Sequence, residues 1–160
     1  MPSPLLFDLS KLDTHKVIID KEGIRKLIPH RYEMEQADGV YYFSKEEHIL
    51  VGFKDVKAEE FWVRGHIPGR PLMPGVLMIE AAAQLSSIYA KLAGGSELAD
   101  KFMGFAGVDQ ARFRGTVVPG DKLIIIINCT DLKGRRALFQ AQGAVNGKMV
   151  FEANIMGMVV

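Results

Sequence analysis

The sequence predicts an α+β fold in which an antiparallel β-sheet wraps around one long central α-helix. Three observations lead to this prediction. An apolar segment at residues 76–92 is bounded by Pro and Gly, apolar strand-like segments follow at residues 123–129, 137–145 and 148–158, and an Asn-Gly pair joins the last two. A helix with apolar residues on every face must be buried on nearly all sides, so we expect the strands to cover it.

The first elements are a short helix and two strands. Asp20 is a residue type that caps helices, and a helix from there through Leu27 is predicted to end before Pro29. Ile24 and Ile28 share one face of it with Leu27. Residues 40–43 and 49–56 are rich in apolar and β-branched side chains, which predicts two strands.

The central helix and the final hairpin have clear boundary residues. Pro74 and Gly75 precede residues 76–92 and glycines follow them, as is typical of helix ends. About 17 residues at 1.5 Å each give a helix roughly 25 Å long, the width of a small domain. Asn146 and Gly147 tolerate positive φ, so they predict a tight turn between the last two strands.

Length and composition favour one ordinary globular domain over residues 1–160, with residues 1–16 as an amino-terminal extension. The 20 basic residues nearly balance the 19 acidic ones, so no overall field attracts nucleic acid or a membrane surface. The single cysteine, Cys129, excludes a disulfide within the chain. No secretory leader pattern or 18-residue uncharged apolar run is present, so we expect a cytoplasmic protein without a membrane span.

The segment at residues 65–84, GHIPGRPLMPGVLMIEAAAQ, carries the chemistry. It places His66 on a loop stiffened by prolines and Glu80 inside the apolar helix. An imidazole accepts a proton near neutral pH, and burial favours the protonated form of a carboxyl group, so the two form a base and acid pair. The N–H groups of Gly75 and Val76, at the positive end of the helix dipole, could hold a carbonyl oxygen as negative charge develops on it.

Taken singly, each feature has a structural explanation. A loop histidine is commonly exposed, and a buried glutamate is commonly paired with a polar neighbour such as Gln84. We assign His30 and His48 to structure or solvent. No metal-ligand spacing, phosphate-binding loop or Gly-x-Ser-x-Gly turn is present in the sequence.

Together, the motifs resemble those of the 3-hydroxyacyl-acyl carrier protein dehydratases of the FabZ/FabA type. The matching stretches are Gly65-His66-Ile67-Pro68, Pro74-Gly75-Val76-Leu77 and Glu80-Ala81-Ala82-Ala83-Gln84, with further similarity at residues 27–32, 111–114 and 117–121. Two stretches depart from the family pattern: Ile67 replaces the usual Phe, and residues 33–38 read Glu-Met-Glu-Gln-Ala-Asp instead of a mostly apolar run.

The resemblance implies a hot-dog fold, homodimers or trimers of dimers with active sites at the subunit interface, and dehydration of (3R)-3-hydroxyacyl groups on acyl carrier protein. It implies that His66 removes the C2 proton, that Glu80 protonates the departing hydroxyl, and that the Gly75 N–H binds the thioester carbonyl. No cofactor is required for such an elimination. The acyl chain is expected to enter an apolar tunnel lined by Phe61, Trp62, Ile67 and Phe105.

Two alternatives remain open from the sequence. A hot-dog acyl thioesterase would use the same fold to direct water at the thioester carbonyl. A non-catalytic paralogue would bind acyl carrier protein or an acyl chain without turning it over, and the altered residues 33–38 are its best support.

Overall fold

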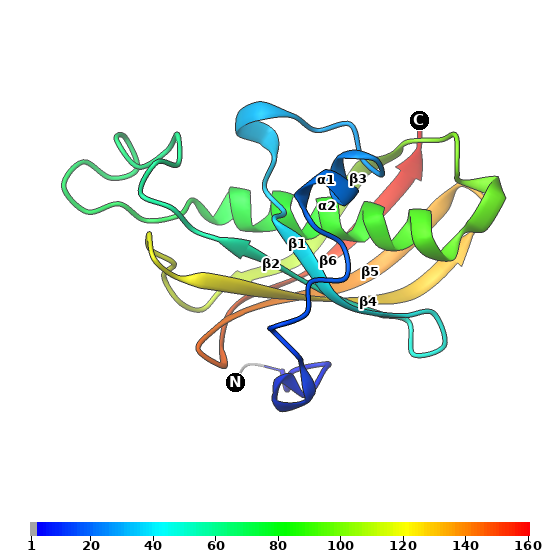
Figure 1. Ribbon diagram of the computed structural model, residues 1–160, viewed down its shortest axis with the longest axis horizontal. Helices are drawn as coiled ribbons and strands as arrows, with labels where there is room; N and C mark the ends of the chain where they lie inside the picture. Colours follow the sequence, from blue (N-terminus) through cyan, green and yellow to red (C-terminus); the bar gives the residue numbers. More distant parts are fainter. Residues whose placement is uncertain (1–2) are drawn as a thin grey trace.

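The computed structural model, which describes residues 3–160, confirms the predicted architecture (Figure 1). One six-stranded sheet has the order β1-β2-β4-β5-β6-β3, and all neighbouring strands are antiparallel. The strands are β1 (Gly39–Ser44), β2 (Ile49–Asp55), β3 (Met103–Phe113), β4 (Lys122–Lys133), β5 (Arg136–Val145) and β6 (Lys148–Val159). The sheet curves under one long helix, α2 (Gly75–Ala93), as the hot-dog fold requires.

Helix α2 forms the centre of the core. Its middle and carboxyl-terminal turns are almost completely buried, with Leu85 and Ile88 at 0% exposure. The helix lies close to β2 because Gly52 has no side chain: a Cβ there would lie 2.5 Å from a methyl carbon of Leu85. By length and composition alone α2 could span a membrane, but 72% of its apolar window is buried inside the fold, as in the core helix of a globular domain.

The short elements follow the local signals in the sequence. Helix α1 (Lys21–Arg25) is capped by Asp20, whose carboxylate accepts the Gly23 N–H at 2.8 Å; it ends two residues before the predicted boundary. The turn between β5 and β6 has positive φ at Asn146 (51°) and Gly147 (79°), which confirms the predicted hairpin. Single 3₁₀ turns occupy Leu9–Lys11, Tyr32–Met34 and Gly95–Glu97.

Strand β3 has no counterpart among the strands predicted from sequence. Gly104, Gly107 and Asp109 are weak strand formers, and two register shifts interrupt its pairing with β6. It nevertheless extends over 11 residues because β6 supplies hydrogen-bond partners along it. The result is a long edge strand whose other side faces no strand of the described chain.

The amino-terminal segment, residues 3–12, covers part of the sheet face opposite α2. Leu5, Phe7, Leu9 and Leu12 pack against a small cluster formed by Ile49, Val51 and Ile126. The buried side chain of Gln142 holds this segment with two hydrogen bonds, accepting the Leu6 N–H at 2.8 Å and donating to the Pro4 carbonyl at 3.0 Å. The segment therefore seals an apolar patch that β2 and β4 would otherwise expose.

Candidate active site

His66 lies on the loop that joins β2 to α2, which extends past the amino-terminal end of the helix (Figure 1). Trp62 and Met73, 4% and 3% exposed, anchor the two sides of this loop in the core. Backbone hydrogen bonds from His66 N to Trp62 O and from Leu72 N to His66 O, both 2.8 Å, hold the histidine between them. The side chain of His66 is thus exposed while its backbone is fixed.

The contact of the His66 ring selects its tautomer. Its Nδ1 lies 2.8 Å from the carbonyl oxygen of Leu72. A carbonyl oxygen only accepts hydrogen bonds, so Nδ1 carries the proton and donates it. In the neutral ring Nε2 is then left with a free lone pair, which is the arrangement that a general base needs.

The amino terminus of α2 offers unpaired backbone donors beside this loop. No side chain caps the helix at Pro74, and the first backbone hydrogen bonds into the turn come from Leu77 and Met78 to the Pro74 carbonyl. The N–H groups of Gly75 and Val76 therefore have no acceptor among the described residues, as is usual for the first turn of a helix. They are available to an oxyanion.

Glu80 lies on the second turn of α2, and its closest ionisable partner is one that the sequence interpretation did not assign to the site. The Nε2 atom of His30 lies 3.8 Å from Oε1 of Glu80, and the two side chains are 18% and 20% exposed. His30, which the sequence indicates to be structural or solvent-facing, is thus a neighbour of the predicted acid. The available signal was its place in residues 27–32, which resemble the dehydratases.

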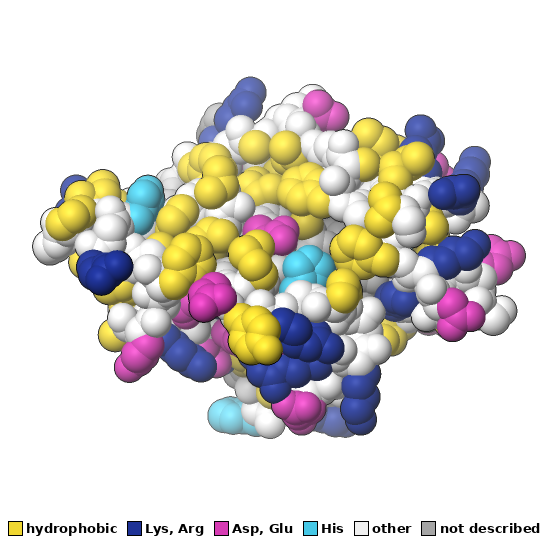
Figure 2. All heavy atoms as spheres, turned by 90° about the horizontal axis from the view of Figure 1, so that it is seen from above, with side chains coloured by type: hydrophobic (Ala, Val, Ile, Leu, Met, Phe, Trp, Pro, Cys, Tyr) yellow, Lys and Arg dark blue, Asp and Glu magenta, His cyan; other side chains and the backbone are white. Residues whose placement is uncertain are grey.

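The face that carries α2 is strongly apolar. Figure 2 shows an acidic and a histidine side chain close together in a hollow surrounded by hydrophobic side chains. Val76, at the start of α2, is 74% exposed. Such a contiguous apolar surface is typical of a binding or association site.

Side chains of Gln84 and Glu35 fix residues 33–38, the segment that departs from the family pattern. The side-chain oxygen of Gln84 accepts the Gln36 N–H at 3.0 Å, and its Nε2 donates to the Met34 carbonyl at 2.7 Å. Glu35 pairs with Arg25 through two hydrogen bonds, and the side-chain hydrogen bond from Arg25 lowers the pKa of that carboxyl below its ordinary value. Arg25 therefore balances the charge of Glu35 within this departing segment.

Within one chain His66 and Glu80 form no direct ion pair in residues 3–160. His66 contacts Leu72, Glu80 contacts His30, and no ion pair within 4.0 Å joins the base to the acid in residues 3–160. The four residues expected to line the acyl tunnel also differ in their exposure to solvent. Phe61, Ile67 and Phe105 are 54%, 49% and 46% exposed, whereas Trp62 is in the core.

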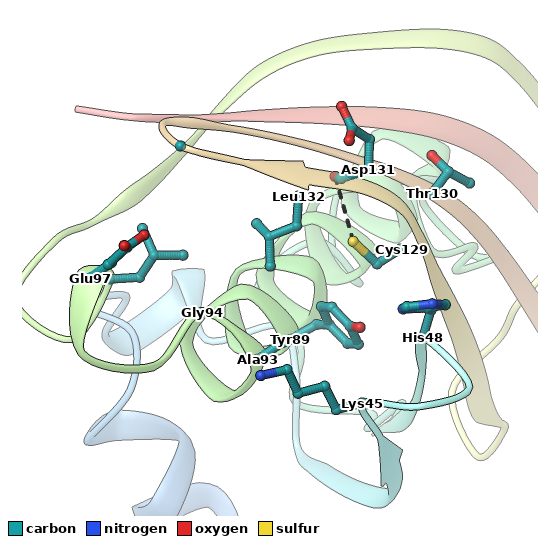
Figure 3. A pocket seen from close by; sticks show the side chains of 12 residues that line it. Lys45, His48, Tyr89, Ala93, Gly94, Glu97, Cys129, Thr130, Asp131 and Leu132 are labelled. Carbon is teal, nitrogen blue, oxygen red and sulfur yellow. Dashed lines mark hydrogen bonds between the residues drawn. The ribbon is translucent and has the colours of Figure 1, made fainter.

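A second hollow lies at the opposite end of α2 and has different chemistry (Figure 3). Its volume is about 530 Å³, and Tyr89, Cys129 and Leu132 line it together with Lys45 and His48. Burial raises the pKa of the Cys129 thiol to about 11 and that of the Tyr89 phenol to about 12. Both groups are protonated at neutral pH, so neither is a strong nucleophile there.

Residues 3–160 contain no group of three or more His, Cys, Asp or Glu side chains placed to hold a metal ion. The residues around the start of α2 offer the imidazole of His66, the carboxyl of Glu80 with its neighbour His30, and the N–H groups of Gly75 and Val76. This set can move protons and stabilise an oxyanion.

Comparison with known proteins gives close relatives over most of the chain. The chain is 39% identical to the 3-hydroxyacyl-[acyl-carrier-protein] dehydratase FabZ of Clostridium botulinum, covering 86% of this chain and 94% of that protein. It is 38% identical to the enzyme of the same name from Geobacter metallireducens, covering 88% and 93%. It is also 40% identical to the bifunctional enzyme LpxC/FabZ of Chlorobaculum tepidum, covering 90% of this chain but 30% of that protein.

Solved structures agree on the fold. The dehydratase heterocomplex ApeI:P from Xenorhabdus doucetiae matches with a TM-score of 0.73 at 16% identity, covering 86% of this chain and 90% of that one. A mutant thioesterase from Pseudomonas aeruginosa matches with a TM-score of 0.61, also at 16% identity, covering 78% and 81%. The family described as the FabA-like domain matches residues 28–154. This match and the dehydratase relatives both include the loop of His66 and the helix of Glu80, and they show that the chain belongs to the FabA-like family.

Proposed function

We propose that this protein dehydrates (3R)-3-hydroxyacyl-acyl carrier protein to trans-2-enoyl-acyl carrier protein in fatty acid biosynthesis. The observation that carries the proposal is the contact between Nδ1 of His66 and the carbonyl oxygen of Leu72, 2.8 Å apart, because a proton on Nδ1 leaves Nε2 free to accept one. The relatives support it, because chains 38–39% identical over most of their length are named as such dehydratases.

The elimination follows from the groups at the site. Nε2 of His66 takes the proton from C2 while the N–H groups of Gly75 and Val76 stabilise the enolate oxygen of the thioester. The electron pair then forms the C2–C3 double bond as the C3–O bond breaks. Glu80 gives its proton to the departing hydroxyl, which leaves as water. Return of the proton from His66 to Glu80 through solvent restores both groups.

The same proposal includes a site shared between two copies of the chain. His66 forms no ion pair with Glu80 of its own chain, and the β3 edge is unpaired in residues 3–160 and carries several exposed apolar side chains. Pairing of two β3 edges about a two-fold axis would cover Phe105, Val108 and Phe113, which are about half exposed in one copy. Each His66 would then work with Glu80 of the partner subunit.

The proposal also covers the oligomeric state of the protein and its binding of acyl carrier protein. We propose a homodimer or a trimer of dimers that binds acyl carrier protein, with the acyl chain in an apolar tunnel completed by Phe61, Ile67 and Phe105. Arg70, on the histidine loop, is exposed and is suited to contact the acidic carrier. Neither a nucleic acid nor a membrane partner forms part of the proposal, and the location proposed is the cytoplasm.

The test is a product assay. Purified protein is incubated with a 3-hydroxyacyl-acyl carrier protein, and mass spectrometry follows both the enoyl thioester and the free acid. We expect the enoyl thioester as the main product and a loss of about 10²- to 10⁴-fold in His66→Ala, with the fold retained. Free acid as the main product would favour the thioesterase alternative, and no turnover with retained carrier binding would favour the non-catalytic one.

The thioesterase alternative has support from fold only. The thioesterase that shares the hot-dog fold is 16% identical, and a shared fold does not transfer a reaction. The dehydratase relatives are more than twice as similar in sequence and cover the loop and helix that carry His66 and Glu80. The dehydratase is therefore the better supported function.

A further inference from the structure

The imidazole of His30 has one ionisable partner within 4.0 Å among residues 3–160. Its Nε2 lies 3.8 Å from Oε1 of Glu80, whereas its Nδ1 is buried and has no hydrogen-bond partner among the described residues. The ring lies beside Phe102, with centroids 5.9 Å apart. The backbone of His30 is also held, since its carbonyl oxygen accepts a hydrogen bond from Arg31 at 2.7 Å.

This environment selects the nitrogen that carries the proton. A buried N–H without an acceptor is rarer and costlier in proteins than an acceptor that lacks a donor. The neutral His30 ring therefore keeps its lone pair on the buried Nδ1 and its proton on Nε2. The Nε2–H group is then the donor that lies 3.8 Å from Oε1 of Glu80.

We propose that His30 is a positioning residue for Glu80: its Nε2–H holds Oε1 and favours the carboxylate that remains once Glu80 has protonated the leaving hydroxyl. The inference rests on the proposed dehydratase function. The present separation exceeds a hydrogen bond, and it closes as charge develops on the carboxylate. Oε2 of Glu80 stays available to the substrate.

The other charged groups around this pair are engaged elsewhere or more distant. Arg31 donates to the carbonyls of Arg25, Ile28 and His30, and Glu35 pairs with Arg25. The remaining charged side chains line the groove shared with Phe102 and the residues just before His30: Lys26, Lys91, Asp100 and Lys101. Among the described residues, only His30 lies within 4.0 Å of the Glu80 carboxylate as an ionic partner.

The experiment compares three substitutions in the full chain by the pH dependence of kcat. His30→Leu removes the donor, His30→Gln returns an N–H group near the place of Nε2, and His30→Asn places its amide near Nδ1. We expect kcat to fall by at least about 10-fold in the Leu and Asn variants. In both, the basic limb of the kcat profile moves to higher pH, because a carboxyl without this donor ionises less readily. His30→Gln restores most of both properties.

Two controls test whether the loss of kcat is specific to His30 and depends on Glu80. His48→Leu removes an exposed histidine at the far end of α2 and leaves kcat and its pH profile unchanged. In a Glu80→Gln background, His30→Leu gives no further loss, because His30 acts only through Glu80.

The possible results distinguish failure of the proposed role of His30 from failure of the proposed dehydratase function. Absence of any enoyl product with the wild-type protein would overturn the proposed function. An active wild type with a normal pH profile in His30→Leu, or equal losses in His30→Gln and His30→Asn, would overturn the role of His30 alone. Because the last two variants both retain a polar side chain, they decide the question even if His30→Leu fails to fold.

Discussion

A methyl group added at Gly75 is expected to disturb the site more than the fold. A Cβ there would lie 2.7, 2.8 and 3.0 Å from three ring carbons of Phe113. Non-bonded carbon atoms sit about 3.5–4.0 Å apart, so the ring and the helix start must separate by roughly 0.8 Å. Phe113 lies at the end of β3, where the proposed dimer would cover it, so we expect the amino terminus of α2 to move.

The effects of Gly75→Ala on stability and activity differ in size. Alanine improves helix propensity by up to about 1 kcal/mol, while overpacking costs about 1–3 kcal/mol. The net loss is at most about 3 kcal/mol, which leaves the fold intact and lowers Tm by up to roughly 12 °C. A misplacement of about 1 Å in a catalytic group can cost roughly 10²-fold in rate. A displaced N–H at position 75 should therefore lower kcat by about 10- to 100-fold.

The assay measures kcat for dehydration and Tm for Gly75→Ala, for Phe113→Ala and for the double variant. Removing the ring relieves the contact, so the double variant should regain most of the activity of Phe113→Ala alone. Wild-type kcat in Gly75→Ala would show that the added methyl group does not displace the N–H at position 75. A double variant that remains as impaired as Gly75→Ala would show that the contact with Phe113 is not the cause.

Three further predictions address assembly, the amino-terminal segment and the thiol. Co-refolding equal amounts of His66→Ala and Glu80→Ala chains should give about a quarter of wild-type activity if sites are shared across a two-fold axis; no recovery with heterodimers confirmed by native mass spectrometry would exclude sharing. Gln142→Leu loses two hydrogen bonds to the amino-terminal segment, about 2 kcal/mol, and should lower Tm by roughly 4–8 °C. The matched Gln140→Leu, on an exposed contact, should shift it far less; equal shifts would contradict the anchor. The Cys129 thiol, 7% exposed with its pKa raised by burial to about 11, should react with a disulfide reagent at pH 8 only after denaturation, and rapid labelling of the native protein would contradict its burial.

Elements whose signals lie within a short stretch of chain can be predicted without the structure. Apolar residues between Pro74 and Gly94 predicted α2 to within one residue at each end, because helix-end signals and periodicity lie within the segment. The Asn146-Gly147 turn was predicted for the same reason. The motifs around His66 and Glu80 indicated the family, which the FabA-like match and the dehydratase relatives confirm.

Contacts between segments far apart in the chain could not be predicted in this way. Strand β3 was missed because its glycines and Asp109 are poor strand formers, and it forms through pairing with β6, about 50 residues later in the chain. The approach of His30 to Glu80 and of Phe113 to Gly75 depends on how α2 is seated on the sheet relative to distant segments. Sequence spacing cannot report such contacts, because the packing of many side chains sets the position of the helix and with it every distance across the site.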